Sequence, residues 1–295
     1  MGAQSSSHFH SLKKKWTKRH EDLKKHIWDK HRDSLTWAQQ SSKQLMAGSL
    51  AGLVMLTQAS TAHAAPQNLL PSPVPAPNER HHRTPDQLVS ELASILPQTV
   101  RSLSQEQKEE VARTLSTSFN LSVASNLQGK ELNRTYGVIG AEQHLTRYPG
   151  DNIITHFQTL EEQSRFARSG MAPGRSAWGY FTDSRSTLTQ KDIDREKYYI
   201  AVQTFLSPGW NESTREYYNF FKYRKMLVVN PENGKAVVVV IGDAGPAPWT
   251  GKQLGGSPEV MQYLERQDGG ARGSVLYFFI DDPADTVPLG PIQIQ

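Results

Sequence analysis

The most informative pattern of apolar residues lies in residues 225–264. An apolar run, KMLVVN, precedes Asn233-Gly234, and a second run, AVVVVI, follows it, with five consecutive β-branched residues at 237–241. Such a run predicts a strand buried on both faces. Asn233-Gly234 predicts a tight two-residue hairpin, because a type I′ turn needs φ > 0 at both central residues. Asp243 then leaves the second strand and enters a loop rich in Gly and Pro, where charged side chains are usually functional.

Helix-capping signals predict two helices farther upstream. Thr84 and Ser104 are each followed three residues later by Gln, the spacing of a capping box, and Pro85 stands at a first helical position. The predicted elements are helices over 88–96, 104–119 and 153–168, and a weak strand over 121–129. We therefore expect residues 84–176 to form a helical and irregular N-terminal subdomain.

The C-terminal part of the chain has the pattern of a small β-domain. Short apolar runs predict strands over 177–181, 198–206, 225–230, 236–241 and 275–281, with a helix near 258–266. Short strands separated by turn residues favour a small closed β-barrel over a sandwich. The predicted fold class is α+β, with a barrel domain over 177–295 preceded by a short helical region.

The N-terminal residues have the composition of a targeting segment. A basic stretch over 13–32, an apolar segment over 45–56 and the small residues of Ala62-His63-Ala64 together predict a signal peptide within residues 1–64. An uncleaved signal anchor is the alternative. Residues 65–83 contain five prolines and predict an extended linker. Both interpretations place the bulk of the protein outside the cytoplasm, in the cell envelope or beyond, with membrane contact only through the N-terminal segment.

Charge and cysteine content exclude several classes of site. Residues 1–44 hold 10 Lys and Arg against 4 Asp and Glu, and the remaining residues hold 23 against 25, so the folded part lacks the basic surface that nucleic acid needs. The absence of cysteine excludes disulfides, thiol nucleophiles and cysteine zinc sites. His144 and His156 are twelve residues apart, without the spacing of a zinc-protease helix, so no metal site and no cofactor is predicted.

Ionisable residues concentrate in the segment 133–151. Glu142, His144, Arg147 and Asp151 lie among glycine and aromatic residues with little periodicity. One interpretation is that they line a binding groove, since such density is typical of functional sites. The other is that the segment is irregular chain packed over the barrel, with His144 held by a backbone carbonyl.

Residues 228–246, VVNPENGKAVVVVIGDAGP, carry a resemblance to a known family. Together with the strands over 177–281 they resemble the six-stranded double-psi β-barrel of the rare lipoprotein A and expansin superfamily. That family includes lytic transglycosylases that act on peptidoglycan and non-hydrolytic wall-loosening proteins. The resemblance implies that peptidoglycan or a related polysaccharide is the partner. Residues 84–176 have no counterpart in the family.

The resemblance implies that Asp243 is the acid/base residue, helped by Asp192 or Asp194. Cleavage of a glycosidic bond needs a proton on a poor leaving group, which a carboxyl with a raised pKa supplies. A transglycosylase can work with one carboxylate, because a hydroxyl of the sugar itself is the nucleophile. Gly245 and Trp249 of the following loop are expected to shape the sugar subsite.

The sequence also departs from the family pattern. Gln203 stands where active members carry a histidine, so a non-catalytic polysaccharide-binding or wall-loosening module is the alternative function. An insertion over 207–221 brings Trp210, Tyr217 and Tyr218, which either stack on sugar rings or pack onto the barrel. A third possibility is an anchored scaffold whose basic N-terminal arm binds a cytoplasmic partner.

Overall fold

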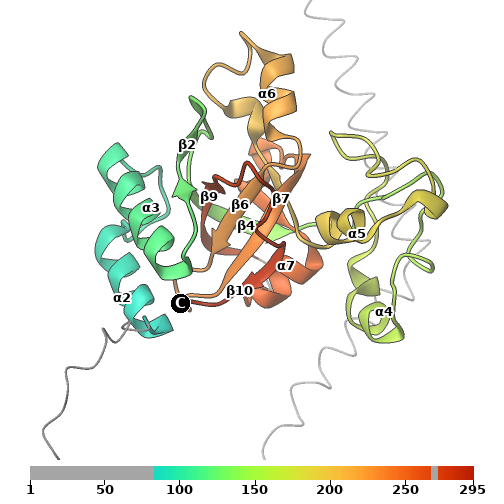
Figure 1. Ribbon diagram of the computed structural model, residues 1–295, viewed down its shortest axis with the longest axis horizontal. Coiled ribbons are helices and arrows are strands. Elements are labelled where there is room, and N and C mark those ends of the chain that lie inside the picture. The colour runs from blue at the N-terminus through green and yellow to red at the C-terminus, as the bar shows by residue number, and fades with distance from the viewer. Residues whose placement is uncertain (1–82, 267–271) are drawn as a thin grey trace, which may run out of the picture. The chain divides into compact units, whose positions relative to one another are not determined.

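A closed six-stranded β-barrel lies at the centre of the structure, a computed structural model that describes residues 83–266 and 272–295 (Figure 1). Around the barrel the strand order is β4, β8, β5, β7, β6, β9 and back to β4. The pairs β4–β8 and β5–β7 are parallel and the other four are antiparallel. The strands are β4 (Tyr136–Ala141), β5 (Tyr199–Val202), β6 (Lys225–Val229), β7 (Ala236–Ala244), β8 (Leu254–Gly256) and β9 (Arg272–Ile280).

The strand β7 is buried on both faces, as its run of β-branched residues predicts. Val237, Val239 and Ile241 belong to the core inside the barrel. Ala236 and Val238 belong to a second core between the barrel and the N-terminal helices. Because successive side chains of a strand point to opposite faces, one apolar run serves both cores.

Two barrel strands differ from the sequence prediction. β4 lies in the segment 133–151, which the sequence leaves irregular, and β8 was not predicted. Both strands contain glycines, which interrupt the apolar alternation by which strands are recognised. The predicted strand over 177–181 is wrong: these residues form turns, with an isolated bridge between Ser176 and Gly179.

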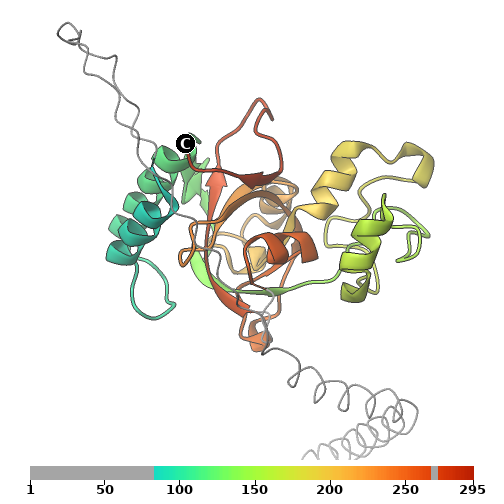
Figure 2. The ribbon, with the colours of Figure 1, turned by 90° about the horizontal axis from the view of Figure 1, so that it is seen from below.

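Helices α2 (Pro85–Ile95) and α3 (Gln105–Phe119) pack on the outer face of the barrel (Figures 1 and 2). Their fully buried residues join outward-facing residues of β6, β7 and β9 in one core. β1 (Val123–Ala124) pairs with β9 and extends the sheet, and β2 (Asn126–Leu127) pairs with β3 (Lys130–Glu131). The two predicted helices are thus confirmed, and they cover an apolar surface of the barrel.

Both predicted capping boxes are present in the structure. The Thr84 side chain accepts a hydrogen bond from Gln87 N, and the Ser104 side chain accepts one from Gln107 N. Gln107 Oε1 in turn accepts from Ser104 N at 3.1 Å.

We expect Ser104→Ala to lower the free energy of unfolding by about 1 kcal/mol, because α3 loses the acceptor for an N-terminal backbone N–H. Urea denaturation of the full chain measures this change. Ser102→Ala is the matched control, because the Ser102 side chain is exposed and caps no helix. Equal stability of the Ser104 variant and the wild type would contradict the expectation.

The other helices lie on further sides of the barrel. α4 (Leu160–Phe166) and α5 (Gln190–Lys197) lie on the side away from α2 and α3 in both ribbon views (Figures 1 and 2). α6 (Thr214–Phe221) is formed by the insertion over 207–221, and α7 (Pro258–Tyr263) contributes Val260 and Met261 to the barrel interior. β10 (Gly290–Ile292) pairs with β7.

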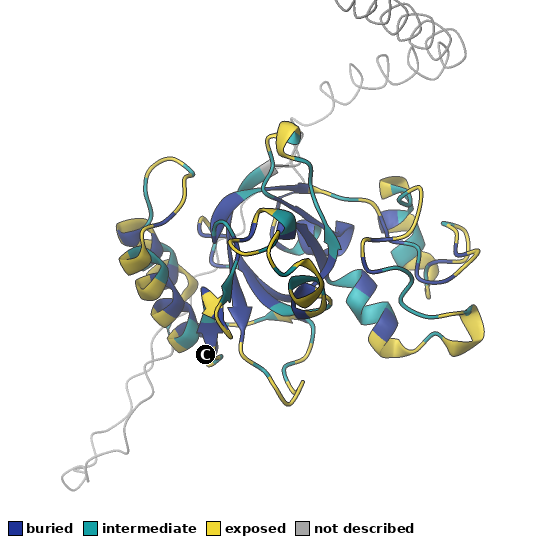
Figure 3. Cartoon of the chain, turned by 90° about the horizontal axis from the view of Figure 1, so that it is seen from above, coloured by how far each residue is buried: buried dark blue, intermediate teal, exposed yellow. Residues whose placement is uncertain are grey.

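Buried positions gather in the barrel strands and on the inner sides of α2 and α3 (Figure 3).

The hairpin between β6 and β7 lies where the sequence predicts it, but its turn is different. Asn230 N donates to Lys235 O at 2.9 Å, so four residues rather than two separate the last paired positions. Positive φ occurs at Gly234 (72°) and not at Asn233, which excludes a type I′ turn. Asn230 Oδ1 accepts from Glu232 N, so the chain turns before Asn233 is reached.

The predicted signal segment (1–64) and nearly all of the linker (65–83) lie outside the described residues. Within 83–266 and 272–295, no helix is both long and apolar enough to cross a membrane.

Candidate functional site

Asp243 lies near the C-terminal end of β7, where the parallel strand β5 runs beside it. Its Oδ1 accepts hydrogen bonds from the backbone N–H groups of Ala177, at 2.6 Å, and of Ala244, at 2.8 Å. Burial raises the pKa of the Asp243 carboxyl, these two hydrogen bonds offset part of the rise, and the negative charge of Glu142 adds to it. The half-buried carboxyl therefore keeps its proton to a higher pH than an exposed aspartate does.

Glu142 reaches the same end of the barrel from the opposite strand pair. It directly follows β4, and its Oε1 accepts a hydrogen bond from Lys252 Nζ at 2.7 Å. The side chain packs over Gly255, where a Cβ atom would come within 2.0 Å of Glu142 Oε1. Gly255 pairs with Ala201, and Ala201 pairs with Asp243, so the two carboxylates belong to one surface.

We expect Glu142→Gln to lower the pKa of Asp243, because removal of a nearby negative charge favours the ionised form of the remaining carboxyl. Titration of the Asp243 carboxyl by nuclear magnetic resonance measures the shift. Glu216→Gln removes an equal charge from α6 and is the matched control. An unchanged Asp243 pKa in the Glu142 variant would show that the two groups are not coupled.

Gln203 holds the loop that follows Asp243. Its Nε2 donates to Pro246 O at 3.0 Å and to Lys252 O at 3.3 Å, and the side chain is buried. Gly245 N donates to Val202 O at 3.1 Å, which ties the loop to the end of β5. Gln203 thus positions backbone around the site through its amide nitrogen.

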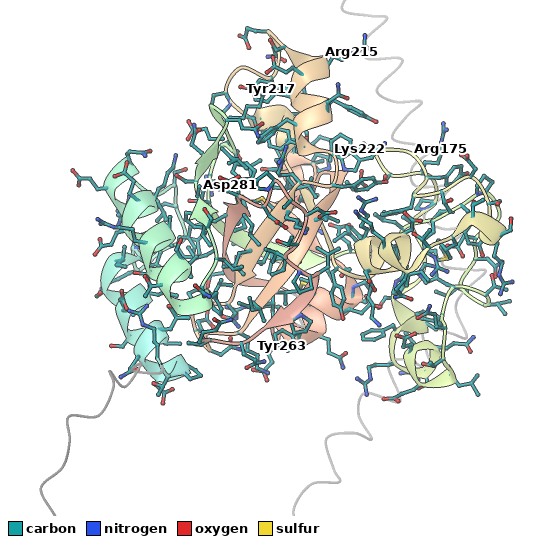
Figure 4. All side chains as sticks on the ribbon, in the orientation of Figure 1. Arg175, Arg215, Tyr217, Lys222, Tyr263 and Asp281 are labelled. Carbon is teal, nitrogen blue, oxygen red and sulfur yellow. The ribbon has the colours of Figure 1, made fainter. Side chains whose placement is uncertain are left out.

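The aromatic residues divide into packed and exposed groups. Trp210 and Tyr217 contact Phe221 with ring centroids 6.3 and 5.9 Å apart, so they pack against the barrel core; Tyr217 lies on α6 (Figure 4). Tyr218 Oη donates to Ala177 O, next to the N–H group that binds Asp243. Trp249, in the loop after Asp243, is 88% exposed. Among the aromatic residues of 83–266 and 272–295, Trp249 is therefore the one most available to a ligand.

Asp192 and Asp194, the predicted helpers of Asp243, make their side-chain contacts within and just before α5. Asp192 Oδ2 accepts from Thr189 N and Thr189 Oγ1 as part of a helix cap. Asp194 Oδ1 accepts from Gln190 Nε2 at 2.8 Å. These contacts give both residues a structural role in α5.

A second cluster of ionisable groups is buried beside the barrel. His156 lies between two carboxylates, with Nδ1 3.0 Å from Asp151 Oδ2 and Nε2 2.9 Å from Glu196 Oε2. Arg147 donates to both oxygens of Asp151 and to His156 O. His144 Nδ1 lies 3.4 Å from Glu196 Oε1, but neither ring nitrogen makes a directed hydrogen bond. The expected bond from His144 to a backbone carbonyl is therefore not present.

The charges of this cluster stabilise one another. Burial alone would raise the pKa of Asp151, but the hydrogen bonds from His156 and Arg147 outweigh burial and hold that pKa below its ordinary value. Burial alone would lower the pKa of His156, yet the hydrogen bonds with Asp151 and Glu196 raise it to about 9. Burial alone would raise the pKa of Glu196, but His144 and His156 lower it to about 2.

The sequence did not predict roles for His156, Lys252 or Glu259. The role of Lys252 depends on the folded structure. The Glu142 side chain lies where a Gly255 Cβ atom would be, and Lys252 donates to it there. His156 meets a residue 40 positions away, and no spacing rule covers such a contact. Glu259 of α7 has a pKa raised to about 7, mainly by burial and further by the charge of Glu196. A single charged residue in a short helix that contains Val260 and Met261 is the signal that the sequence offers.

No protein-family model and no curated protein sequence matches the chain.

Proposed function

We propose that the end of the barrel around Asp243 binds glycan strands of peptidoglycan, or of a related polysaccharide, and cleaves them by acid/base catalysis. The observation that carries the proposal is a half-buried carboxyl whose pKa is raised and whose hydrogen bonds orient it at the end of a barrel strand. A group of this kind keeps a proton for a glycosidic oxygen to a higher pH than an exposed aspartate does.

The proposed reaction needs one proton donor and one proton acceptor. Asp243 protonates the glycosidic oxygen as the C–O bond breaks, and a hydroxyl of the same sugar forms the new bond to the anomeric carbon. We assign Glu142 as the base that accepts the proton of this hydroxyl. Its carboxylate lies on the same surface as Asp243, and Lys252 holds it in place. The products are a shortened strand and an anhydro-sugar end.

The exposed indole of Trp249 supports the glycan class of ligand. Sugar rings stack on aromatic faces, and the Trp249 indole is 88% exposed in the loop that follows Asp243. We assign to Trp249 the stacking of a sugar ring next to the cleavage position. Gly245 shapes the subsite through its backbone, as the family resemblance implies.

We also propose that the barrel is of the double-psi type and that the protein is exported. The two parallel strand pairs in an otherwise antiparallel closed barrel support the first assignment. The basic, apolar and small-residue succession within residues 1–64 supports the second.

A non-catalytic polysaccharide-binding module is the second candidate, and Gln203 is the observation that favours it. The Gln203 amide nitrogen holds loop carbonyls, so the residue at the position of the family's histidine is committed to structure. A protein with this loop can bind glycan without supplying a second proton-transfer group from that position.

Incubation of the full chain with purified peptidoglycan sacculi tests both candidates. Mass spectrometry of the soluble products detects anhydro-sugar ends, and co-sedimentation measures binding. Anhydro products from wild type and not from Asp243→Asn support cleavage. Binding without products supports the binding module. If the folded protein neither binds nor cleaves, both candidates are wrong.

A further inference from the structure

His144, His156 and Glu196 form a buried group that the proposed glycan chemistry does not use. Each offers one ligand atom, and these atoms lie within 4.8 Å of one another. Glu196 Oε2 is 2.9 Å from His156 Nε2, and Glu196 Oε1 is 3.4 Å from His144 Nδ1. An ion bound tetrahedrally to nitrogen and oxygen at about 2.0–2.2 Å separates its ligands by roughly 3.3 Å. The two separations, which involve different oxygens of the one carboxylate, lie on either side of that value.

His144 lacks the hydrogen-bond partners that a buried imidazole needs. Its exposed fraction is 0%, and neither ring nitrogen has a hydrogen-bond partner. Buried polar groups are nearly always partnered, and an ion is one of the recognised explanations for an exception. The ring is held in place by contacts with His156 and Phe157, at centroid distances of 4.9 and 5.2 Å. Its backbone is fixed through Gly170 O and Ala172 N.

The residues around the group orient the other two ligands. Asp151 contacts His156 Nδ1, which leaves Nε2 to face Glu196, and Arg147 holds Asp151. A carboxylate on the far nitrogen of a ligating histidine is a recurrent arrangement in zinc proteins, because it fixes the ring and its tautomer. Glu196 Oε1 accepts from Leu145 N at 2.9 Å, which fixes the carboxylate.

We propose that His144, His156 and Glu196 bind one divalent transition-metal ion of the zinc type, which takes the place of the proton between His156 Nε2 and Glu196 Oε2 and releases it to solvent. Two imidazole nitrogens and one carboxylate oxygen form a donor set that suits such ions.

The burial of the ligands assigns the ion a structural role. All three side chains are almost fully inaccessible to solvent, whereas a catalytic ion needs an open position for substrate or water. The ion would connect three segments of the chain: His144 follows β4, His156 precedes α4, and Glu196 belongs to α5. The site is separate from Asp243 in its residues, so it can be present whether or not the protein cleaves glycans.

Metal analysis of the full chain tests this inference. The protein is freed of metal with a chelator, loaded with Zn²⁺ or Co²⁺ and passed through gel filtration, and bound metal is measured by plasma emission spectrometry. We expect about one firmly held ion per chain and a cobalt absorption band typical of low coordination number. His144→Gln is expected to weaken binding by at least about tenfold. Far-UV circular dichroism checks that each variant is folded.

The N-terminal histidines require a matched control. Eight of the ten histidines lie before residue 83, so metal can bind there without involving the buried group. His81→Ala/His82→Ala is expected to leave the cobalt band and the firmly held ion unchanged. Absence of firmly held metal in folded wild-type protein overturns the proposal. Equal retention of the ion by wild type and by both His144→Gln and Glu196→Gln also overturns it.

Discussion

Asp243→Asn is expected to slow glycan cleavage by about 10²–10⁴-fold, the range found when a positioned proton donor is removed. Asparagine keeps the size of the side chain and an oxygen that can accept from Ala177 N and Ala244 N, so the local backbone is retained. Binding to sacculi should change little, because the substitution removes a transferable proton and leaves the surrounding contacts. The rate of anhydro-sugar release measures the effect.

The pH dependence of the wild-type rate gives a further readout of the same residue. As proton donor, Asp243 is active while protonated, so cleavage should fall as pH rises through its raised pKa. The Asn variant should lose this dependence. Asp86→Asn, in the first turn of α2, is the matched control and should keep the wild-type rate and profile. An Asp243→Asn variant that retains the wild-type rate would remove Asp243 from the chemistry.

Arg147→Met is expected to destabilise the fold by about 3 kcal/mol, the lower end of the usual cost of removing one member of a buried ion pair, because Asp151 keeps its contact with His156. Arg147 is 3% exposed and donates to Asp151 Oδ2 at 2.9 Å and to His156 O at 2.6 Å. Methionine fills most of the volume, so the loss reports the charge and its hydrogen bonds. Chemical denaturation monitored by tryptophan fluorescence measures the free energy of unfolding.

The chain contains a matched control for this substitution. Arg165 and Glu161 form an ion pair four residues apart in α4, at the same 2.9 Å distance, but their side chains are 51% and 78% exposed. Exposed pairs of this kind contribute at most about 0.5 kcal/mol. Arg165→Met should therefore leave stability nearly unchanged. Similar losses for Arg147→Met and Arg165→Met would show that burial does not strengthen the first pair.

The parts of the fold that the sequence predicts are those with strong local signals. Residues 237–241 indicate a doubly buried strand, and the capping boxes at Thr84 and Ser104 locate two helices. β4 and β8 are not predicted from the sequence, because they contain glycines. These glycines allow segments that are distant in the sequence to pack closely. Gly255 is an example, since Glu142 occupies the space of its missing side chain. Such a reason is visible only after the chain has folded.

The candidate site was predictable only at its centre. Asp243 is recognisable because it ends a strongly apolar strand and begins a Gly/Pro loop. Glu142 was expected to face ligand, and it shares the surface of Asp243. The family resemblance implies a helper role for Asp192, whereas its side chain forms part of the cap of α5. The buried cluster depends on a contact between His156 and Glu196 that no local pattern encodes.

The pairing of β4 with β9 has a consequence for the order in which the molecule can form. Tyr136 pairs with Leu276, so the barrel closes through contacts between residues about 140 positions apart, and such distant contacts slow folding. α2 and α3, by contrast, are neighbours along the chain and contact each other directly. The helical pair can therefore assemble early, whereas the surface that carries Asp243 is completed only after the last barrel strand has been synthesised.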